Sequence, residues 1–168
     1  MEAIHTQGGP ATPSQDFAAR ESRLCSLSRE FLGGSRLINH RMSSPLEVHA
    51  TILAGIPYAS LIFLLTTFKA LDERDVVNVL GISARTLRRQ KENPKKSMPA
   101  ALASKTWLFA ATLANASDVF GSKDSAQEWM AKPALGLDRQ RPIDLLQTVQ
   151  GAEVVNDFLM RLEYGVYT

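Results

Sequence analysis

Apolar side chains recur at helical intervals along most of this chain. The clearest run lies between Pro99 and Gly121, where spacings of three, four or seven residues place these side chains on one helix face: Leu102, Thr106, Phe109, Leu113 and Phe120. No stretch alternates between apolar and polar residues for long enough to predict a β-strand. The pattern therefore predicts an all-α protein with about eight short helices.

Capping residues mark where these helices are expected to begin and end. Ser44, followed by Pro45 and Glu47, is a typical helix start, and Gly55 and Pro57 end that helix and open the next one, which is expected to run through residue 71. Each of the other expected helices has a start and an end residue: Asp72 to Gly81, Ser83 to Asn93, Pro99 to Phe120, Ser122 to Lys132, and Gly151 to Glu163. One further short helix is expected to begin at Pro142.

The first 43 residues differ in composition from the rest. They are rich in Gly, Ser, Pro and Gln and contain one short expected helix around residues 17–31, in which apolar side chains are sparse. This segment is interpreted as a partly flexible N-terminal extension. Its helix either stays loose or docks on the body of the protein.

Two of the expected helices meet at Leu80-Gly81-Ile82-Ser83. A tight turn that contains glycine lets the second helix leave the first at a steep angle, as in a helix-turn-helix. Val77 stands in the middle of the first helix, where a smaller residue usually allows close approach. The shared core of the pair is expected to consist of Val76, Val77, Leu80, Ile82 and Leu87.

The second helix of this pair is strongly basic. Between Arg85 and Lys96 the chain has six Lys or Arg residues and one acid, Glu92. Long cations suit DNA phosphates, whereas Arg, Gln and Thr can contact base edges. A solvated basic helix beside an ordinary turn would give the same pattern, because short helix-turn-helix patterns often arise by chance. The predicted DNA-binding residues are Arg85, Thr86, Arg88, Arg89, Gln90 and Lys91.

The C-terminal third carries an ordered set of short motifs. They are Val119-Phe120-Gly121, Ala126-x-x-Trp129-Met130, Pro133-Ala134-Leu135-Gly136, Pro142-Ile143-Asp144-Leu145-Leu146 with Thr148, Gly151-Ala152, and Arg161-Leu162-Glu163-Tyr164-Gly165-Val166-Tyr167. This set resembles the C-terminal toxin-binding domain of the Xre/MbcA/ParS antitoxins, and the preceding helix-turn-helix resembles the N-terminal half of the same family. The loop after Lys132 departs from the family pattern, since it lacks the asparagine often found there and has Leu137 where a second glycine is common.

The resemblance implies an antitoxin of a type II toxin–antitoxin pair. Such a protein neutralises a RES-domain toxin, which degrades NAD, by covering its active site, forms a homodimer, and represses its own operon by binding operator DNA. The chain then divides into an N-terminal extension (1–43), a helix-turn-helix DNA-binding and dimerisation region (44–117) and a toxin-binding domain (118–168). A stand-alone helix-turn-helix transcriptional regulator without a toxin partner is the alternative, because residues 44–116 carry no feature specific to a toxin system.

The chain end is the predicted contact with the toxin. It has two tyrosines and a glycine hinge and is too short to bury itself, and tyrosines give large contact areas at low entropic cost. A frayed terminus is the alternative. The predicted toxin-binding residues are Arg161, Glu163, Tyr164, Gly165, Tyr167 and Thr168. Helical spacing instead predicts core positions at Trp129, Leu145, Leu146, Val155, Phe158, Leu159 and Leu162. Trp107, Leu108 and Ala111 are either a dimer contact or ordinary core.

Composition excludes several classes of protein. The net charge of +2 leaves any nucleic-acid affinity to the distribution of the 19 Lys and Arg residues. Cys25 is the single cysteine and the three histidines have no ligand-like spacing, so neither a disulfide framework nor a metal site is expected. A phosphate-binding glycine loop, a nucleophile elbow and paired catalytic carboxylates are absent from the sequence, so an enzyme is not expected, and no cofactor either.

The membrane is not an expected partner. Residues 1–13 lack the basic start and apolar stretch of a secretory signal. The most hydrophobic window, residues 52–68, is interrupted by Gly55 and Pro57, whereas a membrane-spanning helix needs about 20 nearly uninterrupted apolar residues. A cytoplasmic protein is therefore expected.

Overall fold

The computed structural model describes residues 13–165, and every regular element in that range is helical. The elements are α1 (Pro13–Phe31), η1 (Gly34–Arg36), α2 (Pro45–Ala54), α3 (Tyr58–Thr67), α4 (Glu73–Leu80), α5 (Ala84–Lys91), α6 (Ala100–Phe120), α7 (Lys123–Ala131), η2 (Leu135–Leu137), α8 (Pro142–Leu145) and α9 (Val149–Glu163). Extended pairing within this range is limited to an isolated bridge between Pro57 and Ser97. The prediction of an all-α fold is confirmed.

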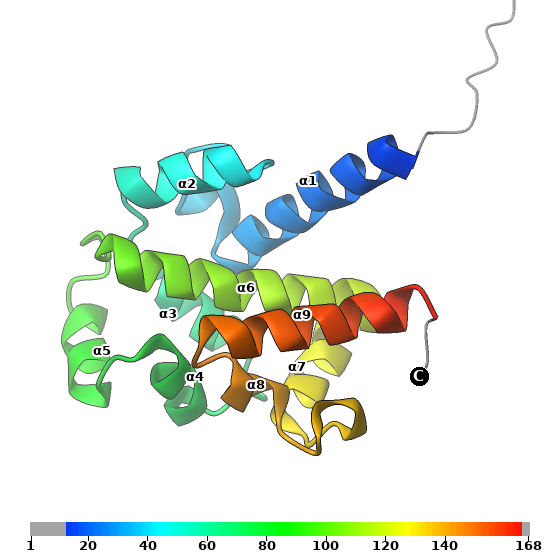
Figure 1. Cartoon of the computed structure of the whole chain (residues 1–168). Coiled ribbons are helices and arrows are strands. Elements are labelled where there is room, and N and C mark those ends of the chain that lie inside the picture. Colours follow the sequence, from blue (N-terminus) through cyan, green and yellow to red (C-terminus); the bar gives the residue numbers. More distant parts are fainter. Residues whose placement is uncertain (1–12, 166–168) are drawn as a thin grey trace, which may run out of the picture.

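The long helix α6 lies at the centre of the fold. Figure 1 shows α9 running beside α6, with α4 and α5 toward the start of α6 and α7 toward its end, and α1 and α6 also pack together. Four alanines of α6 are completely buried, and their small side chains let neighbouring helices approach on several sides: Ala103, Ala110, Ala114 and Ala116. The predicted apolar face is also buried at Leu102, Thr106, Phe109 and Leu113, while Phe120 is partly buried.

The helix of the N-terminal segment docks on the body of the protein. Phe31, at the end of α1, is buried and makes an edge-to-face contact with Phe68, their ring centres being 4.8 Å apart. Ile38 and Met42, from the connection that follows, are buried as well. Of the two alternatives for this helix, the structure shows the docked one, and residues 15–43 contribute to the core.

Most helix boundaries lie where the capping residues placed them. Ser44, Ser83 and Ser122 each cap the following helix by accepting a hydrogen bond from a backbone N–H in its first turn. The carboxylate of Glu47 in turn accepts hydrogen bonds from the backbone and hydroxyl of Ser43, which lowers the pKa of Glu47.

At least three predicted boundaries differ from the structure, and α1 begins at Pro13 rather than at about residue 17. The second helix, α3, ends at Thr67 rather than at residue 71, because Phe68 leaves the helical conformation and the side chain of Gln127 on α7 accepts a hydrogen bond from the Ala70 N–H at 3.0 Å. The last helix, α9, begins at Val149 rather than Gly151, because Thr148 is its N-cap and accepts from the Gly151 N–H at 3.0 Å.

Candidate functional site

Two regions of the molecule carry predicted functional residues, and the first is the pair α4 and α5. Asp72 caps α4 by accepting from the Arg74 N–H at 2.8 Å. Gly81 ends α4 with a positive φ of 67°, a backbone conformation that glycine adopts without steric cost. Ser83 then caps α5 through the Thr86 N–H at 3.0 Å. The tight, glycine-containing turn predicted from the sequence is therefore present.

The inner sides of α4 and α5 bury an apolar cluster. Val76, Val77 and Leu80 of α4 are buried, as is Leu87 of α5, and Ile82 packs against them with partial exposure. Val77 is 6% exposed, so the valine fits where a smaller side chain was expected. Burial on this side fixes which side chains of α5 face outward.

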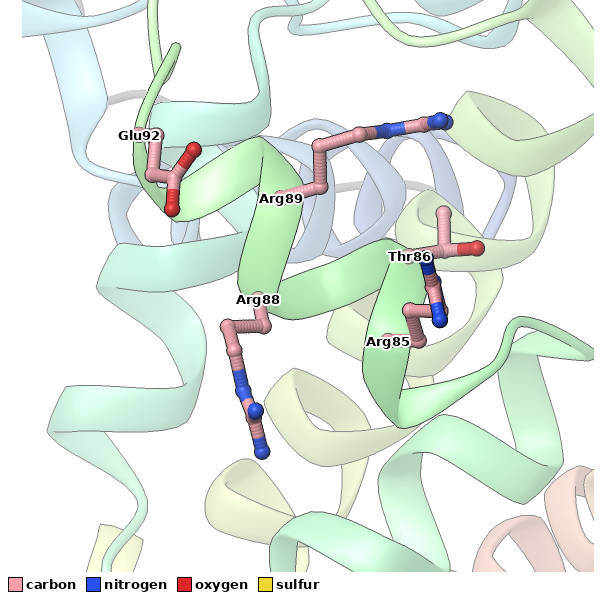
Figure 2. A pocket seen from close by; sticks show the side chains of 5 residues that line it. All are labelled: Arg85, Thr86, Arg88, Arg89 and Glu92. Carbon is pink, nitrogen blue, oxygen red and sulfur yellow. The ribbon is translucent and has the colours of Figure 1, made fainter.

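The outer side of α5 presents unpaired cations. Figure 2 shows the side chains that line a surface hollow here: Arg85, Thr86, Arg88, Arg89 and Glu92. Arg88 and Arg89 extend from the helix in different directions, so the positive charge is spread around its outer side. Among residues 15–165, no ion pair involves any of the three arginines.

Two other predicted DNA-binding residues are placed differently from these arginines. Lys91 is exposed, but its ammonium nitrogen lies 2.8 Å from a carboxylate oxygen of Glu73, which partly neutralises its charge. Thr86 is half-buried, and its hydroxyl lies 2.9 Å from that of Ser83.

The prediction for Gln90 needs correction. Its side chain is 4% exposed, because Gln90 follows Leu87 by three residues and so lies on the same inward face of α5. A side chain buried in this way is not presented to a partner on the outer side of the helix. The spacing from Leu87 was a signal in the sequence that could have shown this.

The second region is the packing of α7, α8 and α9 against the end of α6. Trp129 of α7 stacks on Phe158 of α9 with ring centres 6.1 Å apart and also contacts Phe120 at 5.1 Å. Gly136 lies so close to the Phe158 ring that a Cβ at this position would collide with it. Leu146, Val155 and Leu159 are buried, and the predicted core residues Trp129, Leu145 and Phe158 pack beside them with partial exposure.

The end of α9 combines exposed and paired side chains. Tyr164 is 63% exposed, and Gly165 follows it with a positive φ of 66°. Arg161 is exposed, with its guanidinium 5.9 Å from the centre of the Phe158 ring. Glu163 accepts a hydrogen bond from the Arg20 Nε at 2.8 Å. Tyr167 and Thr168, the other predicted toxin-binding residues, lie outside the described residues.

Arg141 connects the two regions, and sequence reasoning missed it. Its guanidinium donates to Asp144 of α8 at 2.7 and 2.8 Å and to Asp75 of α4 at 2.9 and 3.3 Å. These hydrogen bonds, first to Asp144 and then to Asp75, raise the pKa of Arg141. The local pair with Asp144 has an ordinary helix spacing, but no sequence signal connects Arg141 with Asp75.

Comparison with known proteins bears on the second region. Residues 115–165 match the family model described as the antitoxin Xre/MbcA/ParS C-terminal toxin-binding domain. A protein named antitoxin Xre from Yersinia enterocolitica is 31% identical over 100 residues, which are 59% of this chain and 67% of that protein. The chain belongs to the Xre antitoxin family. Another relative named antitoxin Xre, from Photorhabdus laumondii, is 26% identical to this antitoxin over 132 residues, or 78% of this chain and 88% of that protein.

The matched domain can be located on the fold of the antitoxin. Residues 115–165 comprise the last turns of α6 and all of α7, η2, α8 and α9. The helices α1 to α5 precede it. The resemblance inferred from the sequence motifs is confirmed, and the coarse function follows: this is an antitoxin whose partner is a toxin, a regulatory protein rather than an enzyme.

The described residues form neither a membrane-spanning helix nor a metal-binding cluster. Within residues 13–165, no helix has the length and apolar character needed to cross a membrane. Over the same part of the chain, no group of three or more His, Cys, Asp or Glu side chains is arranged to hold a metal ion.

Proposed function

We propose that this antitoxin neutralises a RES-domain toxin, which degrades NAD, by placing its C-terminal end over the toxin's active site. The observation that carries the proposal is the end of α9, where the toxin-binding domain finishes with Tyr164 exposed and Gly165 turning the chain. An exposed aromatic side chain on an ordered helix end can fill a cleft in a partner at low entropic cost. In this proposal Arg161, Tyr164, Gly165, Tyr167 and Thr168 contact the toxin, and Glu163 lies at the base of the contact.

The second part of the proposal is that α5 binds operator DNA and represses the antitoxin's own operon. Its support is the outer face of α5, where Arg85, Arg88 and Arg89 are exposed and free of ion pairs within the described chain. An arginine that has no ion pair in the free protein breaks none when it binds a DNA phosphate. Guanidinium groups near the start of a helix can also contact guanine edges. Because both NAD and the operon are inside the cell, the proposed site of action is the cytoplasm.

The proposed functions are assigned to successive segments of the chain. Residues 44–117 bind DNA and support dimerisation, residues 118–168 bind the toxin, and residues 1–43 form an N-terminal segment whose helix α1 packs on α6. Among the predicted dimer residues, Trp107 and Leu108 are partly buried against the core. The outer face of α2 is more exposed, with Leu46 at 76% and Leu53 at 65%, two turns apart. We propose the homodimer contact there, because pairing with a second copy would remove these two leucines from water. A dimer would present two copies of α5, as paired half-sites require.

One experiment tests the toxin part of the proposal. The protein is co-expressed with the product of the adjacent reading frame, the complex is purified, and cellular NAD is measured with and without the antitoxin. We expect co-purification and a fall in NAD only when the antitoxin is absent. If the two proteins co-purify but NAD stays constant, the toxin is not of the NAD-degrading class. If no partner binds and NAD is unchanged, the stand-alone regulator is the better interpretation.

A second experiment tests the DNA and dimer parts. The purified antitoxin is titrated against its own promoter fragment at several salt concentrations, and its mass in solution is measured by light scattering. We expect a dimer that binds the promoter with a strong salt dependence. A Leu46→Asp and Leu53→Asp double variant is expected to be monomeric and to bind the promoter weakly. A wild-type monomer, or a promoter affinity equal to that for unrelated DNA, would contradict these parts of the proposal.

A further inference from the structure

The N-terminal helix α1 reaches the end of α9 through a single arginine. The Nε of Arg20 donates to Glu163 Oε1 at 2.8 Å, and its Nη2 contacts the other carboxylate oxygen of Glu163. Nη2 also donates to the side-chain oxygen of Asn115 on α6 at 2.9 Å. Asn115 in turn donates to Asn156 of α9 at 3.3 Å. One guanidinium thus joins α1, α6 and the last turn of α9.

The side chains of this contact are partly exposed, and they differ from a neighbouring pair mainly in the arginine. The side chain of Arg20 is 16% exposed and that of Glu163 is 27% exposed. By comparison, Arg23, one turn further along α1, is 61% exposed where it pairs with Asp118 of α6 at 2.8 Å. A two-point contact between guanidinium and carboxylate that is partly removed from solvent holds its geometry better than an exposed pair. Arg20 therefore fixes Glu163 more firmly than Arg23 fixes Asp118.

The position of Glu163 gives this contact its importance. A carboxylate in the last turn of a helix faces the negative end of the helix dipole, which disfavours helical structure there. The guanidinium of Arg20 offsets this repulsion at the turn from which Tyr164 emerges. Directly after it, the Tyr164 N–H donates to the Met160 carbonyl at 3.1 Å, and Gly165 leaves the helical conformation with a positive φ of 66°.

We propose that Arg20 is a positioning residue for toxin neutralisation: it holds the last turn of α9 so that Tyr164 is preorganised for the toxin. The proposal rests on the proposed function of the chain end. In this proposal α1 helps to position the toxin-binding site, although it lies outside the matched domain at residues 115–165. The physical gain is that less ordering remains to be done when the toxin binds.

The test compares two arginines of the same helix in the full chain. Arg20→Ala removes an ion pair with α9 and a hydrogen bond with α6, whereas Arg23→Ala removes an ion pair with α6. The dissociation constant for the product of the adjacent reading frame and the inhibition of its NAD-degrading activity are measured for both. We expect Arg20→Ala to raise the dissociation constant about tenfold and Arg23→Ala to leave it within about twofold. Equal effects of the two variants would overturn the proposal.

Restoring the charge pair separates positioning from general stability. Arg20→Glu is expected to weaken toxin binding more than Arg20→Ala, because it places two carboxylates together. Arg20→Lys, which keeps a cation at this position and leaves Glu163 unchanged, is expected to bind the toxin more tightly than Arg20→Ala. Melting temperatures of all variants are measured in parallel. If Arg20→Lys restores the melting temperature but not the affinity, Arg20 has a structural role only and the proposal is wrong.

A truncated chain distinguishes failure of this inference from failure of the proposed function. In a chain that ends at Glu163, toxin inhibition is expected to be lost, and Arg20→Ala is expected to add little further loss because nothing remains to be positioned. If the truncated chain still inhibits the toxin, the proposed function of the chain end is wrong, and the role of Arg20 with it. If truncation abolishes inhibition while Arg20→Ala in the full chain has no effect, only the role of Arg20 is wrong.

Discussion

The outer face of α5 and the end of α9 differ in whether their charged side chains form ion pairs. Figure 1 shows them toward opposite ends of the central helix α6. On α5, three arginines are exposed and free of ion pairs among the described residues. At the end of α9, Glu163 is held by Arg20 from the N-terminal helix. A surface for a polyanion gains from unpaired cations, whereas a chain end that enters a partner gains from being ordered beforehand.

The two regions also differ in how far along the chain their stabilising contacts reach. The turn between α4 and α5 is held by neighbours, since Ser83 caps α5 three residues away and Gly81 ends α4. The last turn of α9 is held by a residue 143 positions earlier in the sequence. The first region is therefore expected to tolerate changes elsewhere in the fold better than the second.

The largest expected effect comes from deleting residues 164–168. Toxin affinity is expected to fall at least about a hundredfold, because the exposed aromatic contact is removed entirely. Promoter binding is expected to stay within about twofold, since α5 keeps its local caps. Titration calorimetry with the toxin and a gel-shift assay on the same preparation measure both. Loss of promoter binding together with toxin binding would show that the two regions are not independent.

The next effect concerns the outer face of α5. Arg85→Ala with Arg89→Ala is expected to lower promoter affinity about a hundredfold and to reduce the salt dependence of binding by about two phosphate contacts. Lys132→Ala is the matched control, because this residue is exposed, cationic and far from α5 in the sequence. Fluorescence anisotropy at several salt concentrations measures the slope. An unchanged slope in the double variant would place the DNA contact elsewhere.

A smaller effect is expected where the two regions are joined. Arg141→Ala removes hydrogen bonds to both Asp75 and Asp144 and leaves two carboxylates without their cation. We expect the free energy of unfolding to fall by about 1 kcal/mol, in keeping with a partly exposed ion-pair network. Urea unfolding measures it, with Lys132→Ala as a control that removes an exposed pair within one helix. Equal stability of both variants would mean that the connection contributes nothing.

The smallest effect concerns Cys25, which lines a groove together with Trp107 of α6 and Met160 of α9. Burial, followed by the charges of Glu21 and Glu47, raises the pKa of its thiol. Since the thiolate is the reactive form, alkylation by iodoacetamide at neutral pH is expected to be several-fold slower than in the urea-unfolded chain. The folded chain is expected to reach its half-maximal rate at a higher pH than the unfolded chain. Coincident pH profiles would contradict the raised pKa.

The sequence predicted those parts of the fold that depend on neighbours in the chain. Ser44, Ser83 and Ser122 marked helix starts because a cap acts over three residues. The spacing of apolar residues identified the buried face of α6. The docking of α1 could not be inferred, because its apolar residues are sparse and its anchor, Phe31, is recognised only once Phe68 is known to lie beside it.

The candidate sites show the same limit. The basic residues of α5 could be found by type, but the inward placement of Gln90 required its position on the helix relative to Leu87. No local signal indicated the contacts of Arg20 with Glu163 or of Arg141 with Asp75, because these partners lie 143 and 66 residues away. The predictions for Tyr167 and Thr168 remain predictions.

The length of α6 sets how the two proposed activities combine. Its 21 residues rise on the order of 30 Å, since an α-helix advances 1.5 Å per residue. A toxin at the end of α9 and an operator at α5 would therefore be separated by a rigid spacer as long as a small domain is wide. One antitoxin molecule could then bind toxin and operator DNA at the same time without steric competition. Repression and neutralisation would not have to alternate.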